Sequence, residues 1–129
     1  NNLETALEFY NKAVEIYKGE YFAEEPYLEW LSRKRDLFRI RFIELLQKKA
    51  MLHEELDQID KAVEIWQFIL EADPYFETAY QNLMILFADS GKKNKALDVF
   101  EACRSLLKKD LGTKPAIETL NILDKIKTG

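Results

Sequence analysis

A five-residue pattern occurs three times in this chain and limits how it can fold. Each copy is a small residue, an aliphatic residue, an acid, an apolar residue and an aromatic residue, and the copies begin at Ala6, Ala62 and Ala96. On a helix, the alanine, the aromatic residue four positions on and the residue three positions beyond that share one stripe. A second helix can approach closely at the alanine and pack against the ring. The stripe residues are Ala6, Tyr10, Ala13, Ala62, Trp66, Ile69, Ala96, Phe100 and Cys103.

The spacing of the copies indicates a repeat of two-helix units. The second and third copies begin 34 positions apart, at 62 and 96, and this is the period of tetratricopeptide repeats, whose unit is an antiparallel helix pair. The first and second copies begin 56 positions apart, at 6 and 62, which is one period plus 22 residues. We therefore predict an all-α, tetratricopeptide-like stack of antiparallel helix pairs, in which residues 19–40 add a connector and an extension to one repeat helix.

The positions of Gly, Pro and apolar residues predict about six helices and no strands. Neither Gly nor Pro occurs from 27 to 56, which predicts one long helix buried on more than one side. Its expected inner face is Leu28, Leu31, Phe38, Phe42, Leu45, Leu52 and Leu56, widened by Trp30, Leu37, Ile40 and Ile43. The other expected helices span 3–18, 59–72, 76–90 and 92–109, with a last one starting at Pro115. The apolar side of that last helix is Ile117, Leu120, Ile122, Leu123 and Ile126.

Length and composition indicate one soluble domain, spanning 1–129. No apolar run approaches the length of about 20 residues that a membrane span needs, and the start has no signal-peptide pattern, so we expect a cytoplasmic protein without membrane contact. The net charge of −4 disfavours a dedicated nucleic-acid surface. The chain opens directly on a helix without its partner helix, which predicts a fragment of a longer protein.

No residue pattern supports catalysis, a metal or a cofactor. His53-Glu54 resembles the start of a zinc motif, but the second histidine is missing, so we expect His53 to fill a gap between helices. Cys103 lies on a predicted apolar stripe, which favours a buried, inert thiol. Charges fall in blocks, with seven bases and two acids in 33–49 and eight acids and one base in 54–77. Such blocks are either solvated faces or partner surfaces.

Several segments together resemble the bacterial transcriptional activator domain, the tetratricopeptide-like region that follows the DNA-binding domain in antibiotic-regulatory-type activators. The resemblance is carried by residues 17–22, 27–30 and 62–74 and by the closing turn of Leu111, Gly112, Pro115, Glu118 and Thr119. The closing turn is the most specific part, because the family ends its final repeat on a similar turn. The chain departs from the pattern at Asp57, where a repeat turn usually has Gly, and at Lys49, where an inward aliphatic residue is expected.

The resemblance implies a partner groove lined by the first helix of each pair. Carried onto this chain, the groove positions are Thr78, Gln81, Ile85 and Ala88, and less directly Glu44, Gln47, Met51 and Glu54. None of them is a Lys, Arg or Asn that could clamp a peptide's terminal carboxylate, which disfavours a chaperone-tail adaptor. Plain helix surface is the alternative interpretation of these positions.

These features predict a regulatory interaction module of a bacterial transcription factor, and not an enzyme. Its expected partners are proteins, through self-association or through contacts with other domains of the parent regulator or the transcription machinery. The resemblance implies that DNA binding belongs to a separate winged-helix domain of the parent protein. A free-standing tetratricopeptide adaptor is the alternative, and the sequence encoded upstream would separate the two.

Overall fold

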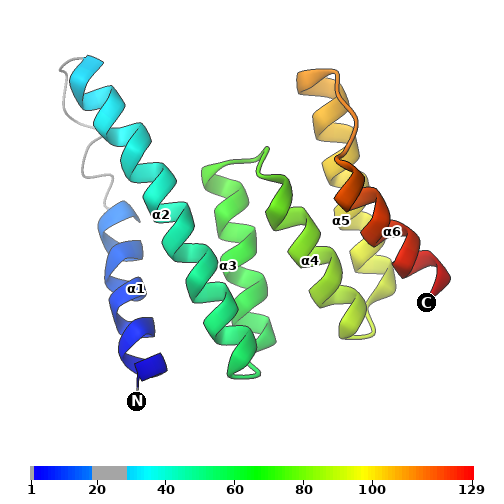
Figure 1. Ribbon diagram of the computed structural model, residues 1–129, viewed down its shortest axis with the longest axis horizontal. Helices are drawn as coiled ribbons and strands as arrows, with labels where there is room; N and C mark the ends of the chain where they lie inside the picture. The colour runs from blue at the N-terminus through cyan, green and yellow to red at the C-terminus, as the bar shows by residue number, and fades with distance from the viewer. Residues whose placement is uncertain (1, 19–28) are drawn as a thin grey trace. The chain divides into compact units, whose positions relative to one another are not determined.

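The fold is all-α, as the sequence predicts. The computed structural model describes residues 2–18 and 29–129, and within these ranges it contains six α-helices and no strand (Figure 1). The chain forms two compact units, Asn1–Ile65 and Trp66–Gly129. The first unit holds α1 (Asn2–Lys18), α2 (Glu29–Glu55) and the first half of α3 (Ile59–Ala72). The second holds the rest of α3, α4 (Glu77–Asp89), α5 (Lys93–Leu106), the π-helical turn η1 (Leu107–Leu111) and α6 (Ile117–Thr128).

The helix boundaries follow the predictions, except near the C-terminus. Helix α3 spans the predicted residues, and α4 begins and ends within one residue of the prediction. The helix predicted over 92–109 changes to π-helical geometry at Leu107, and α6 begins at Ile117 because Ala116 before it is extended. Some predicted features lie outside the residues that the structure describes, namely the segments 19–26 and 27–28, and the side chains of Ala13, Tyr17, Lys18, Trp30 and Leu31.

Two turns repeat 34 positions apart and reverse the chain in the same way. Asp57 and Gly91 both have a left-handed backbone, with φ of 58° and 76°. After α2, the Gln58 N–H donates to the His53 carbonyl at 2.8 Å, and after α4 the Lys92 N–H donates to the Phe87 carbonyl at 2.8 Å. Each turn therefore closes its helix with the same capping motif, which satisfies carbonyls that the helix end leaves open.

The side chain of His53 belongs to the first of these turns. His53 is buried, and its Nδ1 lies 2.6 Å from Gln58 Oε1, so that the ring donates a hydrogen bond across the turn. The histidine is therefore buried at the end of α2 with its polar atom paired.

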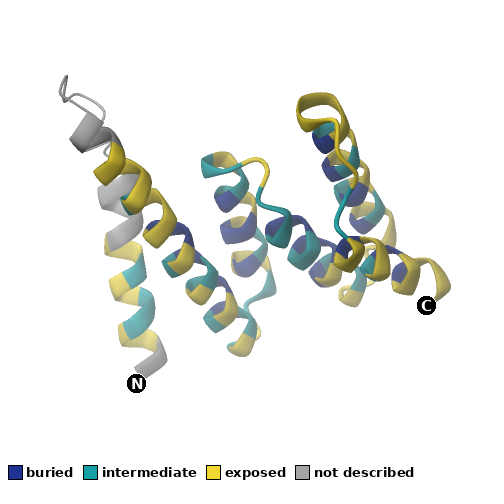
Figure 2. Cartoon of the chain, turned by 45° about the horizontal axis from the view of Figure 1, so that its top comes forward, coloured by how far each residue is buried: buried dark blue, intermediate teal, exposed yellow. Residues whose placement is uncertain are grey.

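The stripe residues of the second and third copies are buried. Figure 2 shows the buried positions of the chain in dark blue. Ala62, Ile69, Ala96 and Cys103 have no exposed surface, and Trp66 and Phe100 are 2% and 9% exposed. In the first copy, Ala6 and Tyr10 are half-buried. A buried alanine with a buried ring one turn later leaves room for a neighbouring helix at one point and fills the space at the next.

The core of the second unit is built between α4, α5 and α6, which contact one another pairwise. One buried cluster joins Met84, Ala96, Phe100, Leu123 and Ile126. A second joins Tyr80, Cys103 and Leu107, with Leu70 of α3 packed against it. The Tyr80 hydroxyl donates to the Pro74 carbonyl at 2.8 Å, so the phenol in this cluster keeps a hydrogen-bond partner.

The buried face of α2 differs from the prediction. The most covered positions are Phe42, Leu46, Ala50 and His53, which follow one another at helical spacing. Leu37 and Ile40, which were expected to widen the inner face, are 47% and 54% exposed. They fall on another side of the helix, which no described element covers, so the prediction of burial on more than one side is wrong for this part of α2.

Lys49, the predicted departure on α2, is half-buried beside α1. Its Nζ donates a hydrogen bond to Asn11 Oδ1 of that helix. The lysine therefore replaces an inward aliphatic residue with a polar contact between α1 and α2.

The inner face of α6 also differs from the prediction. Leu123 and Ile126 are buried with Thr119, whereas Ile117 and Leu120 are 69% and 38% exposed. The polar Thr119 occupies the inward position of the first turn, so the aliphatic residues on either side of it point elsewhere.

We predict that replacing Asp57 with glycine stabilises the chain. A non-glycine residue in the left-handed region costs roughly 1 kcal/mol, and this cost exceeds the extra entropy that glycine loses on folding. The matched control is Gly91→Asp at the equivalent turn, where a Cβ would meet no atom within 4 Å and only the backbone is strained. Urea unfolding should show a gain of about 0.5–1 kcal/mol for Asp57→Gly and a similar loss for Gly91→Asp. Equal signs for the two variants would contradict this account of the turns.

The buried thiol of Cys103 predicts a loss of stability in alkali. Burial raises the pKa of this thiol from 9.0 to about 12, with a smaller effect from the charge of Glu77. Above pH 9 the unfolded thiol ionises while the folded one keeps its proton, so the free energy of the unfolded state falls relative to that of the folded state as pH rises towards 12. The stability advantage of the native chain over Cys103→Ala should therefore shrink between pH 9 and pH 10.5, measured by urea unfolding at about four pH values. An advantage that stays constant over this range would contradict the shift.

Candidate functional site

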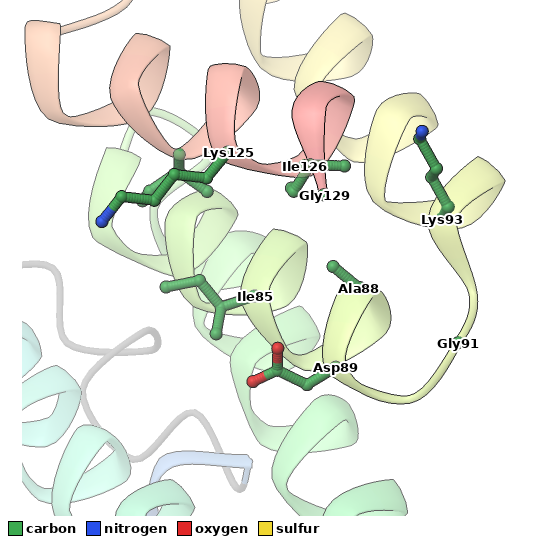
Figure 3. Close-up of a pocket in the computed structure, with 9 residues that line it drawn as sticks. Ile85, Ala88, Asp89, Gly91, Lys93, Lys125, Ile126 and Gly129 are labelled. Carbon is green, nitrogen blue, oxygen red and sulfur yellow. The ribbon is translucent and has the colours of Figure 1, made fainter.

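A solvent-facing hollow lies between the C-terminal half of α4, the start of α5 and α6 (Figure 3). Its volume is about 540 Å³, which falls in the range of about 300–1,000 Å³ typical of ligand and side-chain pockets. We call it the α4–α6 hollow, and all of its residues belong to the second unit. It is lined by Ile85, Ala88, Asp89, Gly91, Lys93, Ile122, Lys125, Ile126 and Gly129.

The apolar lining of the hollow is the outer surface of the core. Ile126 is buried in the cluster with Met84 and Ala96, and Ala88 and Ile122 pack against that cluster. Ile85 is 40% exposed, so its side chain offers apolar surface to a molecule in the hollow. Because this lining is backed by packed core residues, the shape of the hollow is set before anything binds.

Charged side chains stand around this apolar lining. Asp89 ends α4, Lys93 begins α5 and Lys125 lies on α6, so each comes from a different helix (Figure 3). Two cations and one anion give the hollow a small positive excess. An apolar centre with a polar rim is the usual layout of a protein-binding patch.

The predicted groove residues of the second unit divide into two groups. Ile85 and Ala88 line the hollow, whereas Thr78 and Gln81 do not. The Thr78 carbonyl accepts a hydrogen bond from Asn82 Nδ2 at 2.9 Å, and Gln81 Nε2 donates to Thr119 Oγ1 at 2.9 Å. The amide of Gln81 is therefore engaged in holding α6 and faces a residue of its own chain.

The groove residues predicted on α2 lie in the first unit. Glu44 and Met51 are exposed, and Gln47 and Glu54 are half-buried. These positions offer helix surface of mixed polarity on the C-terminal half of α2.

A partly buried polar contact holds α6, which lines one side of the hollow, against α4. Glu77, the first residue of α4, accepts a hydrogen bond from the Ala116 N–H at 2.6 Å and another from the Thr119 hydroxyl. Thr119 has no exposed surface. The carboxylate meets the N-terminus of α6, where the helix dipole favours negative charge. The contact therefore sets both the start and the orientation of the last helix.

The residues of the predicted closing turn have different roles. Gly112 has a left-handed φ of 61° and ends the π-helical turn, which is the role that its place in the turn predicted. Leu111 is 53% exposed and Glu118 is exposed, while Pro115 is half-buried. Of these five residues, only Thr119 forms a hydrogen bond with the Glu77 carboxylate.

Sequence reasoning missed Glu77 and most of the rim. In the sequence, Glu77 is an ordinary first-turn acid of α4. Its partner Thr119 is 42 positions away, so no local pattern indicates that the two residues pair. Lys93, Lys125 and Asp89 each sit near a helix end, where charged residues are common. No spacing in the sequence links these three positions to one pocket.

Within the ranges 2–18 and 29–129, no three His, Cys, Asp or Glu side chains are grouped so that they could hold a metal ion. A search of the same residues finds no helix with the length and apolar character to cross a membrane.

Removing the carboxylate of Glu77 should loosen α6. We predict that Glu77→Gln lowers the free energy of unfolding by about 1–2 kcal/mol, because a charge-assisted acceptor at a helix N-terminus becomes a neutral one. Glu118→Gln is the matched control, since Glu118 is an exposed acid in the first turn of the same helix, and it should change stability by less than about 0.5 kcal/mol. Urea unfolding and amide hydrogen exchange along α6 measure both effects. Equal effects of the two variants would refute the role of Glu77.

Comparison with known proteins identifies the family of this chain. A search of curated proteins finds no match to this chain. The family model of the bacterial transcriptional activator domain matches residues 1–127. That match takes in both compact units, the closing turn and the helix that carries Thr119. The chain therefore belongs to the bacterial transcriptional activator domain family, a regulatory family and not a family of enzymes.

Proposed function

We propose that this chain is the protein-contacting regulatory domain of a bacterial transcription activator, and that a separate winged-helix domain of the parent protein binds the DNA. Residues 1–129 act as one tetratricopeptide-like domain in this proposal. The family membership supports the regulatory setting. The net charge of −4 supports the assignment of DNA binding to another part of the parent protein. Such a regulator works in the cytoplasm, where the chromosome is.

The observation that carries the proposal is the α4–α6 hollow. Its exposed Ile85 and the neighbouring Ala88 and Ile122 form an apolar surface, whose contact with water is unfavourable in free energy. A partner side chain placed there would exchange that water for contact with a rigid lining. Protein interfaces draw most of their binding free energy from a few such central apolar contacts.

In this proposal, the partner at the hollow is either a second copy of the chain or another protein. That other protein is a further domain of the parent regulator or a part of the transcription machinery. Both use the same apolar surface and need no cofactor. The free-standing adaptor is less favoured, because the family match covers nearly the whole chain and is to a domain of transcription activators.

A charged substitution in the hollow should weaken activation. The chain is fused to an unrelated DNA-binding domain, and transcription from a reporter is measured in the source bacterium. We expect the native fusion to activate the reporter and Ile85→Asp to lower activation by about tenfold, because a carboxylate in an apolar contact costs well over 1 kcal/mol.

Ile117→Asp is the matched control. Ile117 is 69% exposed on α6 and does not line the hollow, so this substitution should leave activation unchanged. Thermal unfolding of both variants checks that the fold is intact. A native fusion that activates no more than the DNA-binding domain alone, or equal loss in both variants, would overturn the proposal.

A further inference from the structure

The first half of α2 exposes an unusual combination of side chains. Residues 33–41 contain five bases and one acid, in a chain whose net charge is −4. All nine residues except Phe38 are exposed, and among them are the aliphatic Leu37 and Ile40. A single exposed aliphatic residue is ordinary on a helix, but Leu37 and Ile40 lie three positions apart and so form one small apolar patch among the arginines.

The helical register gathers four of these side chains on one face. Arg33, Leu37, Ile40 and Arg41 follow one another at spacings of four, three and one residues, so they share one side of α2. We call these four residues the α2 basic face. Along it, two aliphatic side chains lie between two guanidinium groups.

Three arginines of this region, Arg33, Arg35 and Arg41, form no ion pair within the described residues. The ion pair found here joins Arg39 to Asp36 at 3.8 Å, and none within the described ranges involves Arg33, Arg35 or Arg41. The α5 residue Arg104 shows the contrast, because Glu101 beside it raises the pKa of its guanidinium and the pKa of Glu101 is lowered in turn. Among the side chains that the structure describes, no acid pairs in this way with Arg33 or Arg41.

We propose that the α2 basic face binds an acidic amphipathic segment of a protein partner. Carboxylates of the partner pair with Arg33 and Arg41, for which arginine offers two parallel donors. Aliphatic side chains of the partner cover Leu37 and Ile40 between those pairs. This surface is separate from the α4–α6 hollow, since the two belong to different compact units of the chain.

A protein partner suits this face better than nucleic acid. A phosphate backbone would pair with the arginines, but it would leave Leu37 and Ile40 in water and gain nothing from them. An acidic helix or strand with aliphatic residues on one side uses both features. The apolar pair is therefore the feature that distinguishes the two kinds of partner.

The test uses the whole chain and a labelled synthetic probe. The probe is a helical peptide with leucines on one side and glutamates flanking them, and its binding is followed by fluorescence anisotropy at low salt. Two further peptides replace either the leucines with serine or the glutamates with lysine. A short DNA duplex serves as the competing class of partner.

Charge reversal and removal of the aliphatic residues should each weaken binding. We expect the double variant Arg33→Glu with Arg41→Glu, and the double variant Leu37→Ser with Ile40→Ser, each to bind the leucine and glutamate peptide about tenfold more weakly. The matched control is Lys108→Glu with Lys109→Glu, an equal change of charge at exposed positions of η1, which should change binding by less than about twofold. The serine and lysine peptides should bind the native chain about tenfold more weakly.

Three results would overturn the proposal. The first is binding that depends on the charges but is unchanged by Leu37→Ser with Ile40→Ser. The second is tighter binding of the duplex, lost on reversal of the arginines. The third is sedimentation showing that a second copy of the chain occupies the face, with self-association abolished by Arg33→Glu with Arg41→Glu. Because neither double variant touches Ile85, activation in the reporter assay above separates failure here from failure of the proposed function.

Discussion

The close approach of helices at buried alanines is the constraint on which the rest of this structure depends. Ala96 has no exposed surface and lies in one cluster with Met84 of α4 and Phe100 one turn further along α5. A larger side chain at Ala96 would push α4 and α5 apart, and the ring of Phe100 would then lose its packing. Leu123 and Ile126 of α6 complete the same cluster, so the position of the last helix follows from that close approach.

Local signals were enough to predict the helices and the turns. Period, Gly and Pro placed α3 at its observed residues, and the repeat of 34 recurs in the left-handed turns at Asp57 and Gly91. These features depend on a few neighbouring residues, which the sequence displays directly. The π-helical geometry at Leu107 had no such signal, since the residues there are compatible with either type of helix.

Features that depend on contacts between distant helices could not be predicted in the same way. The face of α2 was assigned from its apolar residues alone, but the structure covers Leu46 and Ala50 and leaves Leu37 and Ile40 exposed. Apolar character states which residues gain from burial, and the neighbouring helices decide which of them are buried. On α6 the same reasoning failed, because Thr119 pairs with Glu77 and takes an inward position that aliphatic residues were expected to fill.

In the candidate site, too, some features could be predicted from local sequence, and others depend on contacts between distant helices. Family resemblance pointed to α4, and two of its four groove positions, Ile85 and Ala88, do line the hollow. Gln81 was also expected there, but it donates to Thr119 instead. Its role was hidden because the partner is 38 positions away on another helix. The lysines of the rim come from two further helices, so only the folded chain brings them to one place.

The two proposed surfaces would contribute to binding in different ways. The α4–α6 hollow is apolar at its centre and nearly balanced in charge at its rim, so a partner held there would dissociate slowly and respond little to salt. The arginines of the α2 basic face would act mainly on the rate of encounter, since exposed charges steer an oppositely charged partner over about a Debye length. A regulator that uses both can raise its association rate by charge while its residence time is set by apolar contact. Salt would then slow association at the α2 basic face and leave dissociation from the hollow nearly unchanged.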